Sequence, residues 1–238
     1  MQIGVLYVIT THFVEFLAAF TGLFFYSKFK PYPAKYFIWF LWYLSICDLL
    51  NVYVYFAHPD RFLHFLIGTG LEKNYWWTTV YWKIGAILFF SFYYYKILKT
   101  KRLKNGVKFA GISFFVYALV CIVFNWNDFF IKFFPSISVF GAAIIFLCTT
   151  FYFLEILNSP SILTFYKSIN FYISAAIFIW WLIITPIVFF DIYLVYDIET
   201  LNQDLDFVFV RRLIYLSSNV IMYLTFTFAL IWCRPEND

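Results

Sequence analysis

The stretch Ser136–Leu157, SISVFGAAIIFLCTTFYFLEIL, decides the fold class. A helix that crosses a hydrocarbon layer about 30 Å thick needs roughly 20 consecutive apolar residues, and this stretch supplies them. Its only charged residue, Glu155, stands near its C-terminal end. We therefore expect a transmembrane helix over residues 136–157.

Similar apolar runs follow one another along the whole chain. They cover residues 3–26, 36–57, 75–97, 107–125, 136–157, 169–191 and 208–232. Composition agrees, because 64% of the residues are hydrophobic and only 13% are charged, whereas soluble domains average about 25% charged residues. The sequence predicts an all-α integral membrane protein with a lipid bilayer as its solvent: a seven-transmembrane helix bundle forming one membrane domain over residues 1–238.

Basic residues in the loops predict the orientation of this bundle, since cytoplasmic loops carry an excess of Lys and Arg. The loops after the first, third and fifth runs, with the C-terminal tail, carry Lys28, Lys30, Lys35, Lys96, Lys99, Lys101, Arg102, Lys104, Lys108, Lys167 and Arg234. The other side carries Arg61, Lys73, Lys132, Arg211 and Arg212. We expect the N-terminus outside and the C-terminus in the cytoplasm, in the cell membrane of a bacterium (the inner membrane).

Polar residues inside the runs are the best indication of a site, because a charged side chain within a bilayer costs at least about 3 kcal/mol and usually faces the bundle interior. At 1.5 Å per residue, polar groups on four helices fall about 12–15 Å below the outer boundary, with one carboxylate a turn deeper. The candidates for a ligand-binding or ion-binding site are His12, Glu15, Asp48, Asn51, Lys83, Ser217 and Asn219. We expect Lys83 to face the interior within salt-bridge or one-water reach of Asp48 or Glu15. A buried ion pair that only fixes helix packing is the alternative.

Sequence motifs give no sign of catalysis or of a cofactor. H-E-x-x-H, G-x-S-x-G, P-loop and C-x-x-C patterns are absent, so we assign no catalytic residue, no metal site, no cofactor and no nucleic-acid partner. Trp76-Trp77 and Trp180-Trp181 resemble the aromatic pairs of microbial rhodopsins, but the last run contains no lysine for covalent retinal. An intramembrane enzyme stays a third alternative, after a sensor and a transporter.

The second half of the chain carries a family resemblance. The residues concerned are Phe151 to Leu157, Pro160, Phe171 to Ile173, Asn219, Met222-Tyr223 and Ile231-Trp232. They resemble an uncharacterised group of seven-helix bacterial membrane proteins of Bacteroidetes type. The resemblance implies that the gene lies near genes for sensor histidine kinases, and hence that the protein has a sensory role. It implies no functional residues, because no member of the group has an assigned site.

Two functions therefore stand as hypotheses. The first is a receptor-like sensor with a polar site among spans one, two, three and seven, which signals through a separate partner. That partner would contact Lys96, Lys99, Lys101, Arg102, Lys104 and Lys108, although the same residues could simply rest on anionic lipid headgroups. The second is a small transporter or proton-coupled carrier that uses the same buried charges.

Overall fold

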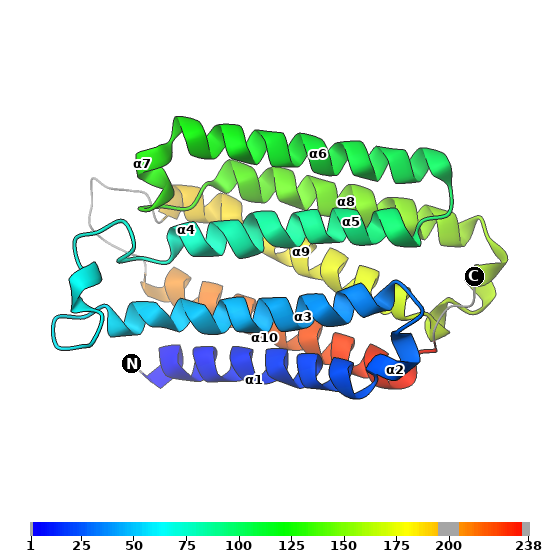
Figure 1. Ribbon diagram of the computed structural model, residues 1–238, viewed down its shortest axis with the longest axis horizontal. Helices are drawn as coiled ribbons and strands as arrows, with labels where there is room; N and C mark the ends of the chain where they lie inside the picture. Colours follow the sequence, from blue (N-terminus) through cyan, green and yellow to red (C-terminus); the bar gives the residue numbers. More distant parts are fainter. Residues whose placement is uncertain (1, 195–204, 235–238) are drawn as a thin grey trace.

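The computed structural model describes residues 2–194 and 205–234, and nearly all of them are helical (Figure 1). The long helices are α1 (Gln2–Phe24), α3 (Ala34–Leu50), α6 (Lys101–Phe124), α8 (Pro135–Leu157), α9 (Ile169–Leu194) and α10 (Leu205–Trp232). Short helices join them: α2 (Tyr26–Phe29), η2 (His64–Leu66), α7 (Trp126–Phe129), η4 (Pro160–Leu163) and η5 (Phe165–Lys167). The described residues contain no β-strand, which confirms the all-α prediction.

Residues 75–97 are helical throughout, but in three consecutive segments. α4 (Tyr75–Thr78) leads into a π-helical segment, η3 (Thr79–Ala86), and α5 (Ile87–Ile97) completes the stretch. A π-helix is rare and is frequently found at functional sites, since its wider turn shifts the side chains that follow. Here it carries Tyr81 and Lys83.

The ends of the helices follow the local chemistry. Pro135 occupies the first turn of α8, where its missing N–H costs nothing. α3 passes at Asn51 into a 3-10 segment, η1 (Asn51–Phe56), so the predicted second run is helical almost to its end. α9 continues through Pro186, and the hydroxyl of Thr185 donates to the carbonyl of Trp181 within the same stretch. The loop at 60–73 contains one short helix, η2, of three residues.

The helices form a ring with α6 outside it. α1 packs between α3 and α10, α9 packs between α10 and α8, and α5 packs against α8 and α3, which closes the ring. α6 lies against α5 and α8 on the outside (Figure 1). Gly111 of α6 permits this close approach, because a Cβ there would lie 2.9 Å from the Cβ of Ser91.

The surface of the bundle is that of a membrane protein. Six helices of the described residues are long and apolar enough to cross a membrane, over Leu6–Phe24, Ala34–Phe56, Lys101–Phe124, Pro135–Leu157, Ile169–Phe190 and Phe207–Trp232. Large apolar side chains such as Phe13, Phe109 and Val123 are each at least 65% exposed along their flanks. Since a soluble protein rarely exposes such continuous apolar surface, the chain is a multi-pass membrane protein of α-helices.

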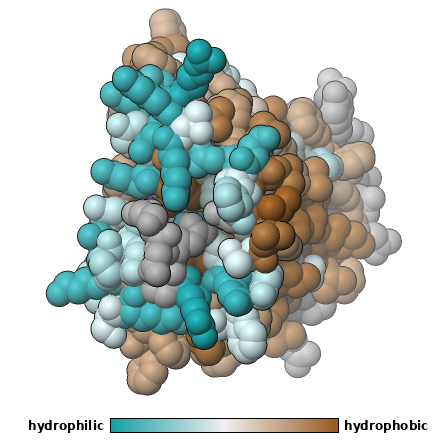
Figure 2. Space-filling model, turned by 90° about the vertical axis from the view of Figure 1, so that its right-hand side faces the viewer, coloured by the Kyte–Doolittle hydropathy of each residue, from teal (hydrophilic) through white to brown (hydrophobic). Residues whose placement is uncertain are grey.

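One end of the bundle gathers the basic loops. α1 begins at the opposite end, whereas α10 ends here, at the same end of the bundle as α2, the α5–α6 turn and the α8–α9 connection (Figure 1). Hydrophilic residues collect on this end, beside a hydrophobic flank (Figure 2). Lys28 donates to the carbonyl of Ile231 at 3.2 Å, and burial lowers the pKa of its ammonium group. The backbone N–H of Arg234 bonds the carbonyl of Lys167, so these loops are tied together.

Candidate functional site

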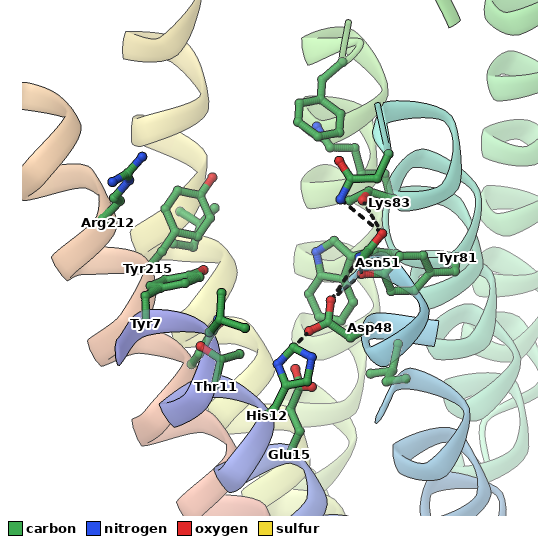
Figure 3. A pocket seen from close by; sticks show the side chains of 18 of the residues that line it. Tyr7, Thr11, His12, Glu15, Asp48, Asn51, Tyr81, Lys83, Arg212 and Tyr215 are labelled. Carbon is green, nitrogen blue, oxygen red and sulfur yellow. Dashed lines mark hydrogen bonds and ion pairs between the residues drawn. The ribbon is translucent and has the colours of Figure 1, made fainter. Parts of the chain in front are cut away.

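A cavity of about 640 Å³ lies inside the half of the ring where α1 begins. Six helical regions line it, and α6 contributes nothing among the described residues (Figure 3). Its polar lining residues include Tyr7, Thr11, His12, Glu15, Asp48, Asn51, Asn74, Thr78, Tyr81, Lys83, Ser138, Trp180, Arg211, Arg212, Tyr215, Asn219 and Tyr223. The lining reaches residues at the helix ends, among them Asn74 and Pro135, and goes no deeper than Glu15 on α1 and Leu44 on α3.

Asp48 is the centre of a hydrogen-bond network on one wall of the cavity. Its Oδ1 atom accepts the hydroxyl of Tyr81 at 2.7 Å and the side-chain amide of Asn51 at 3.1 Å. The Asn51 amide also donates to the Tyr81 hydroxyl at 2.6 Å. Because Asp48 and Asn51 are three residues apart on one helix, both side chains reach the same tyrosine. The network therefore fixes the orientation of the Asp48 carboxylate and leaves its Oδ2 atom facing α1 (Figure 3).

The network continues toward the end of the bundle through Asn51. The side-chain carbonyl of Asn51 accepts the amide of Asn74 at 3.2 Å and the hydroxyl of Thr78 at 3.4 Å. Asn51 is thus satisfied as donor and as acceptor. This residue, predicted as a site candidate, serves to hold Asp48 in place.

His12 and Glu15 face Asp48 from α1. The Nδ1 atom of His12 lies 3.7 Å from the Oδ2 atom of Asp48. Neither ring nitrogen of His12 has a hydrogen-bond partner within the described chain, and the same is true of the Oε2 atom of Glu15. One ligand atom from each of His12, Glu15 and Asp48 lies within 4.8 Å of those from the other two. The structure thus brings together three candidates that the sequence placed at neighbouring depths on two helices.

Lys83 lines the same cavity and contacts α8. Its ammonium group donates to the hydroxyl of Ser138 at 2.8 Å and lies 4.2 Å from the centre of the Phe133 ring. A direct ion pair with Asp48 or Glu15 is not among the ion pairs of the described residues, where Asp48 is paired with His12. Helical depth alone did not give the direction of this side chain, which points toward Ser138 of α8. The one-water reach to Asp48 or Glu15 stays a prediction.

Of the two site candidates on α10, one lines the cavity and the other does not. Asn219 lines the cavity, and its side-chain carbonyl accepts the indole N–H of Trp180 at 2.7 Å. Ser217 is exposed, and its hydroxyl bonds the carbonyls of Leu213 and Ile214 in its own helix. Ser217 is not among the residues that line the cavity, since two positions along a helix turn a side chain through about 200°.

Sequence reasoning missed Tyr81, Ser138 and Trp180 as parts of the site. In a chain with 20 Tyr and 9 Trp residues, one more aromatic residue carries no signal. Tyr81 does stand two positions before Lys83, the one lysine deep in a run, and that neighbourhood was the available clue. Ser138 lies on α8, which is not among the spans to which the sequence assigned the polar site.

The cavity combines carboxylates, an imidazole and cationic side chains within walls rich in Tyr and Trp. Such a site can bind a small polar ligand or a cation, and its titratable groups can exchange protons. Comparisons with protein-family models, with curated proteins and with solved structures found no match for this chain.

Proposed function

We propose that the protein is a receptor-like membrane sensor of the bacterial inner membrane. Its seven spans, counting residues 75–97 as the third, place the N-terminus outside and the C-terminus in the cytoplasm. A small polar ligand enters the cavity from the outer side. The resulting change in helix packing is passed at the inner end to a separate signalling partner.

The observation that carries this proposal is the confinement of the cavity to one half of the bundle. Below Tyr223, which lines it, Phe226 packs edge to face with Phe37, with ring centres 4.9 Å apart. Phe37 in turn contacts Tyr93, and both of these side chains are fully buried. A binding site above a floor of packed aromatic rings favours ligand sensing over passage through the bundle.

The orientation rests on the basic residues at the end opposite the cavity. Positive charge accumulates on the cytoplasmic side of membrane proteins, and the loops tied together by Lys28, Lys167 and Arg234 lie at that end. The cavity then opens toward the exterior.

The start of α6 is the surface we assign to the partner. Of the basic residues predicted there, Lys96, Lys99, Lys101, Arg102 and Lys108 are exposed and Lys104 is half-buried. The carboxylate of Glu155 accepts the backbone N–H groups of Lys99 and Thr100 at 2.7 and 2.9 Å. α6 is thereby joined to α8, whose other end lines the cavity, which gives a rigid connection from the ligand to the basic surface.

A proton-coupled carrier is the second candidate, and the cluster of His12, Glu15 and Asp48 favours it. These three titratable groups lie together at the edge of the cavity, and chains of such groups are typical of proton-coupled transporters. A carrier must also expose the site to the inner side, which requires the aromatic floor to open.

A ligand screen followed by an uptake assay tests the proposal. Thermal unfolding of the detergent-solubilised protein is measured against a set of small polar metabolites, and we expect at least one to raise the unfolding midpoint. The stabilisation should be lost in Asn219→Leu, which alters the cavity, and retained in Ser217→Ala, two residues away and outside it. Accumulation of the same ligand in proteoliposomes contradicts the receptor and favours the carrier. This holds also where the ligand stabilises both variants equally.

A further inference from the structure

We propose that His12, Glu15 and Asp48 bind one divalent transition-metal ion, such as Zn²⁺, in the cavity. This inference rests on the proposed function only in that it names a ligand of the same cavity. It is independent of whether the bound ion is sensed or transported.

The separation of the donor atoms fits a metal ion better than a hydrogen bond. The His12 Nδ1 to Asp48 Oδ2 distance of 3.7 Å exceeds the 2.7–3.2 Å range of a hydrogen bond. Two ligands of a tetrahedral Zn²⁺ with bonds of about 2.1 Å lie roughly 3.4 Å apart. The three donor atoms all lie within 4.8 Å of one another, which is close to that spacing.

Unpartnered polar atoms inside the bundle call for a cation. Glu15 is only 5% exposed, and its Oε2 atom has no hydrogen-bond partner in the described chain. Both ring nitrogens of His12 likewise lack a hydrogen-bond partner in the described chain. A buried polar atom without a hydrogen-bond partner costs a few kcal/mol. One divalent ion would satisfy Glu15, His12 and the second oxygen of Asp48 together.

Hydrogen bonds orient the Asp48 carboxylate in the way that is usual for a metal ligand. Its Oδ1 atom is occupied by Tyr81 and Asn51, while its Oδ2 atom faces His12. Hydrogen bonds from outer residues commonly orient a ligating carboxylate in this way. Tyr81 is therefore a positioning residue for the ion, although it does not touch it.

The donor set indicates the class of ion. One imidazole with two carboxylates suits Zn²⁺, Mn²⁺ or Fe²⁺, whereas Mg²⁺ and Ca²⁺ prefer oxygen donors alone. Three protein ligands leave at least one coordination position open. Because His12 and Asp48 line the cavity, that position faces the space in which a further ligand would bind.

The test is a titration of the chelator-treated full chain, in lipid nanodiscs, with ZnCl₂ in competition with a chromophoric chelator. We expect one Zn²⁺ per chain. His12→Gln, Glu15→Gln and Asp48→Asn should each weaken binding by more than about 100-fold, since each removes a direct ligand, and Tyr81→Phe by about 10-fold. Thr11→Val is the matched control, because Thr11 adjoins His12 on α1 and lines the same cavity; it should bind as the unaltered chain does.

Titration with Co²⁺ supplies a second measurement that needs no variant. Co²⁺ bound by these residues should give visible absorption bands, which an excess of Zn²⁺ should abolish. Each variant is first checked for a single peak in gel filtration. Absence of stoichiometric Zn²⁺ binding by the unaltered chain overturns the inference. Zn²⁺ binding that survives in all three ligand variants overturns it as well.

The outcomes separate this inference from the proposed function. An organic ligand that stabilises the chelator-treated chain, together with the absence of stoichiometric Zn²⁺ binding, leaves the sensor standing and refutes the metal site. Zn²⁺ that binds through the three residues and accumulates in proteoliposomes confirms the metal site and refutes the receptor.

Discussion

Tyr81→Phe tests the network that holds Asp48. The Tyr81 hydroxyl donates to Asp48 at 2.7 Å and accepts from Asn51 at 2.6 Å, and the residue is only 4% exposed. A hydrogen bond to a charged group contributes about 1.5–3 kcal/mol and a neutral one about 1 kcal/mol. Asn51 keeps its own 3.1 Å bond to Asp48, which retains part of the stabilisation. We therefore expect the free energy of unfolding to fall by about 2–3 kcal/mol.

The unfolding midpoint should then drop by roughly 4–12 °C, at about 2–4 °C per kcal/mol for a chain of this size. The assay is thermal unfolding of the detergent-solubilised protein, followed by tryptophan fluorescence. Tyr7→Phe is the matched control, because Tyr7 lines the same cavity and its hydroxyl has no hydrogen bond within the described residues. Combined with Asp48→Asn, Tyr81→Phe should cost less than it does alone, since the charged acceptor is gone. Equal midpoints for Tyr81→Phe and Tyr7→Phe would refute the reasoning.

Two further predictions concern packing and orientation. Gly111→Ala should lower the free energy of unfolding by about 1–3 kcal/mol, because its new Cβ overlaps the Ser91 hydroxyl between α5 and α6. Ser113→Ala, on the exposed side of α6, is the control. A loss for Gly111→Ala no greater than that of the control contradicts this packing. In a background without the native cysteines, Asn105→Cys should react with an impermeant maleimide only after the inner face is opened, and Asp60→Cys should react in intact cells. The reverse pattern would invert the proposed topology.

Part of the candidate site could be predicted from the sequence. His12, Glu15 and Asp48 were identified because charged groups in apolar runs must face the bundle interior, and the helical rise gave their depth. Depth is one coordinate of three, however. Ser217 had a suitable depth and faces away from the cavity, while Lys83 had a suitable depth and contacts Ser138 on α8.

The sequence by itself determined the membrane class, the positions of the helices and the level of the polar residues. Each of these follows from local quantities: the length of an apolar run, the chemistry of its ends and the rise per residue. Only the tertiary structure decided which polar residues meet, because the rotation of each helix and its neighbours in the ring depend on packing between segments far apart in the chain. The π-helical turn before Lys83 and the place of α6 outside the ring are two such outcomes. The meeting of His12, Glu15 and Asp48 around one point is the third, and the proposed metal site rests on it.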